Sequence, residues 1–538
     1  MMENAVTGQW WMEWRQRFAG QGRRVKVALL ALALVVAVLL GAALILSPLS
    51  IWKTTAVLVV ALAAAWLAGR SLLSRQPVEW LFLAFVALLP FTRAALLNIE
   101  FGLQPNYLAI VGVLGLLLLR ALALRLPLRI PRSPVTILLL VFVAIVGFSC
   151  LMSGQTPLRE FRGEVRWIRS LKQFAVLIFM VLTYVMVMLV VQSRVLLRRS
   201  LQVFLVISVL VALYGLYQFV AYPLGLPFVD VFGTNVSFRQ TRLYAIALAG
   251  GRFLRVWSTL SEPVWFGDYL VAVIPLLTAY VLAKQRPLPL PRRWHLALLV
   301  PLLLALLLTF ARSAWFALLA ALAVLALTFF RPREILRWAV ILAVIGLLLI
   351  PVDMMIARLP IASGASLLQA VASRFLSPFQ QEDFGNIHRY TGIVASLDIF
   401  RAHPWLGVGY GNFGFYFDLH KPFWGQAISD VLNVFPVMSG GMFFRLLSET
   451  GIVGTAAFAL LLLAVAWEGW RAWRALRGDP FLSATAAGLL ASYVGLVVRL
   501  TMADSIHFTY TWFIVALIVV LARRAERMRG EAPSPEVA

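Results

Sequence analysis

Apolar stretches long enough to cross a bilayer fill most of the chain, and short polar connections separate them. A transmembrane helix needs roughly 20 apolar residues, and this rule predicts about fourteen spans. The candidate spans lie near residues 27–47, 54–73, 78–98, 107–124, 134–152, 173–192, 200–220, 263–283, 295–310, 314–330, 338–351, 450–468, 481–500 and 508–522. The pattern therefore predicts an all-α polytopic membrane protein with about 12–14 transmembrane helices.

The longest polar interruption runs from residue 351 to residue 449. It contains His388, Arg389, the run HPWLGVGYGNF at 403–413, and SETG at 448–451. Long segments between elements are usually either functional loops or disordered. Because this one is rich in aromatic residues and turn signals, we interpret it as one large functional loop domain.

Composition supports the membrane assignment. The chain of 538 residues is 62% hydrophobic and 13% charged, whereas soluble domains are nearer half apolar and a quarter charged. The formal charge of +24 does not indicate nucleic-acid binding, because the basic residues are scattered between apolar segments. The single Cys150 lies in an apolar run, which excludes a disulfide framework and a cysteine metal site.

Lysine and arginine in short loops predict the orientation, since such loops stay in the cytoplasm when they are basic. With a cytoplasmic N-terminus, every second connection is short and basic, and the even number of spans places both termini in the cytoplasm. The predicted organisation is a cytoplasmic interfacial segment (1–26), N-terminal transmembrane helices (27–199), a transmembrane region (200–350) with an external loop (221–262), a large periplasmic or extracytoplasmic loop (351–449), C-terminal transmembrane helices (450–522) and a cytoplasmic tail (523–538).

Arginine is common in the connections predicted to lie outside. One explanation is that long loops cross regardless of charge, and that their arginines pair with Glu160, Glu164 or lipid headgroups. Arg312 is different, because it stands in a tight turn between apolar runs at 302–310 and 314–329. An ionisable residue at membrane depth is costly and indicates function. A diphosphate is a suitable partner, because guanidinium groups bind phosphate oxygens through two hydrogen bonds.

Three segments lie on the same predicted side: RFLRVWSTLSEP at 252–263, LTFARSAW at 308–315, and the long loop with SETG at its end. Their order and topology resemble the O-antigen ligase/polymerase family of bacterial membrane glycosyltransferases over roughly residues 200–470. Arg255, Arg312, Arg389 upstream of the 403–413 run, and Glu449 with the following Thr-Gly stand at the matching positions.

One position departs from the family pattern. Ligases of this family carry a His-Asn pair shortly before the Glu-Thr-Gly, and that histidine is the expected general base for the acceptor. Here the corresponding residues are Gly440 and Gly441. Either another residue acts as the base, or the protein is a polymerase-type member in which that histidine is not fixed. The departure favours a polymerase.

The resemblance implies an undecaprenyl-diphosphate-linked oligosaccharide donor and a glycan or lipid acceptor, with no cofactor. Arg255, Arg312 and Arg389 would stabilise the leaving diphosphate in an inverting reaction. The sequence has no paired-carboxylate motif and no His/Cys cluster, which favours a metal-independent mechanism. We expect a hydrophobic groove between spans to hold the polyprenyl chain. The predicted substrate-binding residues are Arg252, Arg401, Asn412, Glu449 and His507.

Several residues are candidates for the acceptor base. His388 is the first choice, with a solvated loop histidine as the alternative. Glu262 precedes Pro263 and is equally explained as an acid favoured by a helix dipole. Asp504 and His507 form a suggestive pair in a short turn. Two further histidines are less informative: His403 precedes a proline and is expected to shape the loop, and the role of His420 stays open. The glycines of the 403–413 run follow no buried strand, so we expect them to form a tight turn rather than a nucleotide site.

The sequence and the resemblance thus predict an O-antigen or exopolysaccharide polymerase working at the outer face of the bacterial cytoplasmic (inner) membrane. A ligase acting on a lipid A-core or other terminal acceptor is the first alternative. A transporter or flippase of lipid-linked glycans is the second, although no internal repeat of the transporter kind is apparent. Membrane lipids are expected partners, a chain-length regulator or a flippase is a candidate partner, and nucleic acid is not.

Overall fold

The computed structural model describes residues 76–91, 105–125, 132–152, 156–161, 163–224, 226, 245–248, 251–330, 371–372, 384–422, 439–503 and 506–530. The interfacial segment 1–26, the predicted spans 27–47, 54–73 and 338–351, and the tail beyond residue 530 lie outside this described part. Phe85–Ile110 and Ile130–Ala538 belong to one compact unit, and every contact discussed below lies within it.

Helices make up almost all of the described chain. Their bounds are α4 Gln76–Leu88, α5 Pro105–Leu124, α6 Pro134–Met152, α7 Arg166–Val190, α8 Arg194–Ala221, α10 Pro263–Leu282, α11 Arg292–Leu308, α12 Arg312–Phe329, α15 Phe384–Ala402, α16 Phe413–His420, α18 Met442–Ala475, α19 Pro480–Leu500 and α20 Thr509–Gly530. Among the described residues, 8 helices are long and apolar enough to cross a membrane. The protein is an all-α polytopic membrane protein, as the apolar pattern predicts.

Local sequence signals set several helix starts. Asp479 caps α19, because its side chain accepts from the amides of Phe481 and Leu482, and Pro480 follows at a position where a missing amide hydrogen costs nothing. Ser193 caps α8 in the same way by accepting from Leu196. Two short antiparallel hairpins interrupt the helices: β1 Glu160–Phe161 with β2 Glu164–Val165, and β3 Ala245–Leu248 with β4 Gly251–Leu254.

Connections predicted to face the cytoplasm gather at one end of the helices. Arg194, at the start of α8, forms an ion pair of 2.7 Å with Asp479 before α19. Arg198 donates to the carbonyl of Arg286, between α10 and α11. Arg471 of α18 pairs with a glutamate of α20 at 2.7 Å. Successive helices therefore alternate in direction as the basic pattern predicts, while the side of the membrane on which these loops lie stays a prediction.

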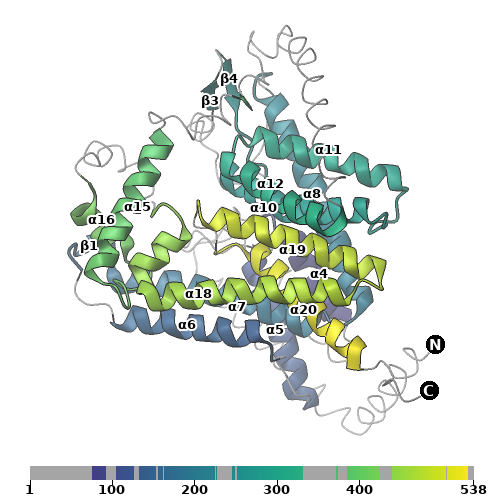
Figure 1. Ribbon diagram of the computed structural model, residues 1–538, viewed down its shortest axis with the longest axis horizontal. Helices are drawn as coiled ribbons and strands as arrows, with labels where there is room; N and C mark the ends of the chain where they lie inside the picture. Colours follow the sequence, from purple (N-terminus) through teal and green to yellow (C-terminus); the bar gives the residue numbers. More distant parts are fainter. Residues whose placement is uncertain are drawn as a thin grey trace, which may run out of the picture. The chain divides into compact units, whose positions relative to one another are not determined.

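Helices α10, α12 and α19 pack closely (Figure 1). Small residues allow this approach, since a Cβ at Gly267 of α10 would lie 2.8 Å from Cβ of Ala314. A Cβ at Gly495 of α19 would likewise lie 3.0 Å from the carbonyl of Ala317 in α12. Close packing of small residues is a principal source of helix association in lipid, where the hydrophobic effect contributes little.

The region predicted as one long loop contains two further helices. α15 and α16 lie beside the first turns of α18 (Figure 1). They bury a small apolar core of their own, centred on Ile399, Phe415 and Phe417. α18 begins at Met442, before the start near residue 450 that hydropathy predicts. Hydropathy misses the first turns because they are only moderately apolar.

Candidate functional site

α18 is interrupted at Gly451, where the backbone dihedrals are φ 63° and ψ −163°. A break of this kind leaves amides and carbonyls without helical partners. Residues 403–413, here called the strap, supply the missing hydrogen-bond partners. The amide of Ile452 donates to the carbonyl of Pro404 at 2.9 Å, and the amide of Val408 donates to the carbonyl of Ser448 at 3.0 Å. The strap is therefore hydrogen-bonded directly to the broken helix.

Three glycines give the strap its path. Gly407, Gly409 and Gly411 have φ values of 65°, 95° and 88°, in a region that L-residues with a side chain rarely adopt. A Cβ at Gly407 would also overlap the backbone at Glu449. The expectation that these glycines form a tight turn is confirmed.

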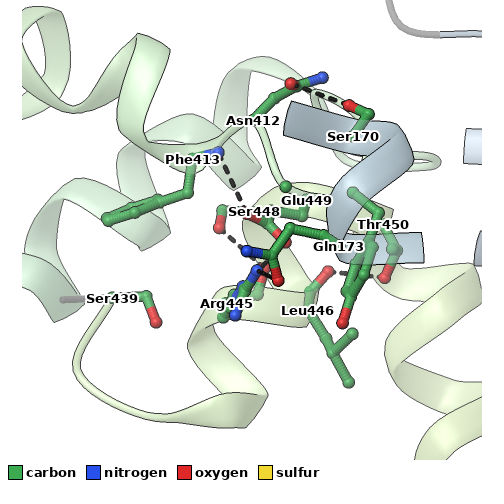
Figure 2. Close-up of polar contacts among 12 residues, drawn as sticks. Ser170, Gln173, Asn412, Phe413, Ser439, Arg445, Leu446, Ser448, Glu449 and Thr450 are labelled. Atoms are coloured by element: carbon green, nitrogen blue, oxygen red, sulfur yellow. Dashed lines mark hydrogen bonds and ion pairs between the residues drawn. The ribbon is translucent and has the colours of Figure 1, made fainter. Parts of the chain in front are cut away.

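The Glu449 carboxylate fastens the strap to α18 (Figure 2). It is 1% exposed, and its two oxygens accept from the amide of Phe413 at 3.1 Å and from Nε of Arg445 at 3.0 Å. Asn412, fully buried, accepts from Ser170 of α7 at 3.1 Å. Both predicted substrate-binding residues thus have internal partners, and a direct role in binding substrate stays a prediction.

The start of α7 holds the other side of the strap. Nε of Arg169 donates to the carbonyl of Gly411 at 3.1 Å, and its Nη1 lies 3.3 Å from the Glu164 carboxylate. Lys172 contacts the same carboxylate at 2.7 Å. For Arg169, the explanation that outer arginines pair with nearby acids is confirmed.

Two of the predicted catalytic arginines meet at the turn between α11 and α12. Arg255 follows β4, and its Nε donates to the carbonyl of Thr309 at 3.0 Å. Arg312 is the first residue of α12, and its Nη2 donates to Oδ1 of Asn386 in α15 at 3.2 Å. Arg389 lies one helical turn beyond Asn386. The sequence-distant segments that carry the three arginines are therefore linked by direct contacts.

Gly440 and Gly441 lie against the same helix. Gly440 has φ 90°, and a Cβ there would lie 3.1 Å from the carbonyl of Arg389 and would overlap Ile393. A Cβ at Gly441 would overlap the carbonyl of Thr501, just beyond α19. The position at which the resemblance expects a histidine therefore borders Arg389, and it has no room for a side chain.

Two further predicted catalytic residues are His388, next to Arg389 in α15, and Glu262, just before α10. His388 is buried in α15, and its pKa is lowered by burial and, to a smaller degree, by the neighbouring Arg389. The imidazole is therefore neutral at neutral pH and able to accept a proton. Glu262 precedes the first residue of α10, and Gly267, about 7 Å further along that helix, lies against the α11–α12 turn.

The remaining predicted residues lie elsewhere. Arg401 is exposed in the last turn of α15, about 18 Å along the helix from Arg389. His420 contacts Asp398 at 2.6 Å. Backbone alone is described for Arg252, in β4, and Asp504 lies outside the described residues. His507 is half-buried with its ring centroid 5.3 Å from that of Phe508.

A small apolar groove lies between α18, α19 and α20. Leu500 and Ile506 are among the residues that line one end of it, and Val465 and Val515 are among those further in. The carbonyl of Leu500 also faces Gly441. One residue that lines the groove therefore borders the glycine turn next to Arg389.

Sequence reasoning missed two features near the arginines. Asn386, which binds Arg312, gave no signal because a lone asparagine in a polar loop is unremarkable. Asp268 and Arg499 form a fully buried ion pair between α10 and α19. The signal was present in the sequence, since each is a charged residue inside an apolar stretch.

The protein is thus a polytopic membrane protein in which the segments that carry Arg255, Arg312 and Arg389 are in contact. The family model described as O-antigen ligase matches residues 297–459, from α11 to the middle of α18. The match supports membership of the O-antigen ligase/polymerase family. It supports a membrane glycan-processing enzyme, with lipid-linked glycan and acceptor as the implied substrates. No curated protein matches the chain.

Proposed function

We propose that the protein is an inverting glycosyltransferase that polymerises oligosaccharide repeat units linked to undecaprenyl diphosphate. The observation that carries this proposal is the contact series from Arg255 through the α11–α12 turn to Arg312, and from Arg312 through Asn386 to the helix that bears Arg389. Three permanent cations carried by contacting segments would suit a diphosphate better than a neutral sugar.

In the proposed reaction, a hydroxyl of the acceptor attacks the anomeric carbon of the donor sugar. The bond from that carbon to the diphosphate oxygen breaks on the opposite face, and Arg255, Arg312 and Arg389 stabilise the charge on the departing undecaprenyl diphosphate. His388 takes the proton of the attacking hydroxyl. Its lowered pKa supports this role, because the ring is already neutral when the acceptor binds.

The apolar groove is our proposed position for the isoprenoid chain of the donor. Its described lining is apolar, and one end lies beside the glycine turn next to Arg389. A polyprenyl diphosphate bound there would place its headgroup at the arginines and its chain among the helices. We further propose that the arginine end of the helices faces the periplasm, since the basic loops gather at the other end.

The test is reconstitution in lipid vesicles with a purified undecaprenyl-diphosphate-linked oligosaccharide, with and without a candidate acceptor. A ladder of products shows polymerisation. A single capped product shows ligation, the second candidate, with which the description of the matching family model is compatible. If neither product forms under any donor and acceptor combination, the proposal fails.

Arg312→Ala should abolish transfer, and Arg194→Ala is the matched control. Arg194 is an arginine that also begins a helix, but it lies at the basic end and pairs with Asp479. Donor movement between leaflets, followed in the same vesicles, separates the enzyme from a flippase. A variant that still moves the lipid but does not extend the glycan supports the enzyme, whereas loss of movement supports the transporter.

A further inference from the structure

The buried ion pair between Asp268 and Arg499 has no role in the reaction described so far. Nε of Arg499 donates to Oδ1 of Asp268, and Nη2 donates to Oδ2 at 3.0 Å. Both side chains are 0% exposed. The guanidinium therefore grips the carboxylate at two points, between two helices that are apolar enough to span the membrane.

Such a pair is a poor way to stabilise a protein. Removing two charges from water costs several kcal/mol per ion, and their attraction often does no more than offset that cost. The pair is also not optimised, because Nη1 of Arg499 has no hydrogen-bond partner among the described residues. Aromatic rings crowd the site instead, with the rings of Tyr269 and Tyr510 5.4 Å apart. A feature that costs this much is expected to be retained for what it positions.

The residues next to the ion pair contact segments close to Arg312 and Arg389. Gly267, next to Asp268, is in close contact with Ala314, two residues after Arg312. On the other helix, the carbonyls of Leu500 and Thr501, immediately after Arg499, face Gly441. Asp268 thus lies next to a residue that packs on the start of α12, and Arg499 lies next to residues that pack on the glycine turn beside Arg389.

We propose that the Asp268–Arg499 pair is a positioning element for the arginines that hold the donor diphosphate, an inference that rests on the proposed function. The two-point contact sets both the distance and the rotation of α10 relative to α19. This in turn sets how far the start of α12 lies from the glycine turn at α15. Neither Asp268 nor Arg499 touches substrate in this proposal.

Arg499→Lys is the most informative variant, because lysine keeps the charge but replaces the planar two-point contact by a single one. Tyr280→Phe is the matched control: the Tyr280 hydroxyl bonds Oγ1 of Thr485 at 2.8 Å, and it joins the same two helices near their other end. We expect Arg499→Lys to lower kcat about tenfold with the acceptor KM unchanged. Tyr280→Phe should leave kcat near the wild-type value.

A reciprocal exchange guards against loss of folding. Asp268→Arg combined with Arg499→Asp should recover most of the kcat and of the folded yield that Asp268→Arg alone loses. If the pair were purely structural, breaking it would lower the unfolding midpoint of the protein without changing kcat per folded molecule. That result, or an equal loss of kcat in Tyr280→Phe, or an exchange variant that recovers neither folding nor kcat, overturns the inference.

The proposed function and the inference fail in different ways. If wild-type protein transfers no glycan, or if Arg312→Ala transfers it normally, the proposed function fails. If Arg312→Ala is inactive while Arg499→Lys matches the wild type in kcat, the positioning role alone is wrong.

Discussion

Replacing Glu449 by alanine tests whether this carboxylate fastens the strap or binds substrate. The change removes the acceptor of the Phe413 amide and the ion-pair partner of Arg445. Breaking a buried pair by removing one partner typically costs about 3–5 kcal/mol. We take the lower end, about 3 kcal/mol, because Arg445, 12% exposed, keeps its contacts with Gln173 and with the ring of Tyr410.

Hydrogen exchange measures this cost directly. Each 1.4 kcal/mol is a factor of ten in an opening equilibrium, so the amides of Val408, Gly409 and Ile452 should exchange roughly 100-fold faster. Asp418→Asn is the control, since Asp418 is half-exposed in the neighbouring α16 and its pair with Lys421 is worth little. If exchange is unchanged in Glu449→Ala while the donor KM rises, the fastening argument is refuted and the predicted substrate contact gains support.

Three further changes extend these arguments. Gly440→Ala should destabilise the turn by about 1–2 kcal/mol from its positive φ alone, and it should reduce transfer by displacing Arg389. Gly478→Ala is the control, because there is open space around its Cβ, and it should have neither effect. Equal thermal midpoints and equal transfer rates in the two variants would contradict this prediction. Because the pKa of His388 is lowered, the transfer rate should stay level as pH falls to the ordinary histidine pKa and should decline only below it. In a pH–rate profile, His388→Gln should lower the rate and abolish this decline at acid pH. Val515→Trp should fill the apolar groove and raise the donor KM with little change in kcat. The KM of a donor with a shorter isoprenoid chain, measured in parallel, should rise less.

Much of the helical architecture follows from hydropathy, because a bilayer span must be both apolar and internally hydrogen-bonded. α6 has the predicted bounds, and α10 and α19 begin within a residue of theirs. α7, α8 and α18 begin several residues before their predicted starts, and the first turns of α18 carry Arg445 and Glu449. A hydropathy window excludes such residues, although their charges are satisfied by each other within the helix.

The candidate site was only partly predictable. Arg312 could be singled out because a charge in a tight apolar turn has few explanations, and its contact with Asn386 joins it to the helix of Arg389. The roles of Asn412 and Glu449 could not be assigned, because family motifs mark positions without saying which atoms are buried. Asp268 was overlooked because one acid in a long apolar run hardly changes its mean hydropathy, and its partner lies 231 residues away in the sequence.

The way the strap is held has a practical consequence for engineering. Its acceptors and donors belong to the bundle: Oγ of Ser149 in α6 donates to the carbonyl of Glu449 at 2.9 Å, and Ser170 of α7 donates to Asn412. A fragment cut out as a soluble module would lose these partners and should not keep its conformation. Chimeras that exchange specificity between homologous enzymes therefore need junctions that carry the end of α6, the first turns of α7 and the start of α18 along with the grafted region.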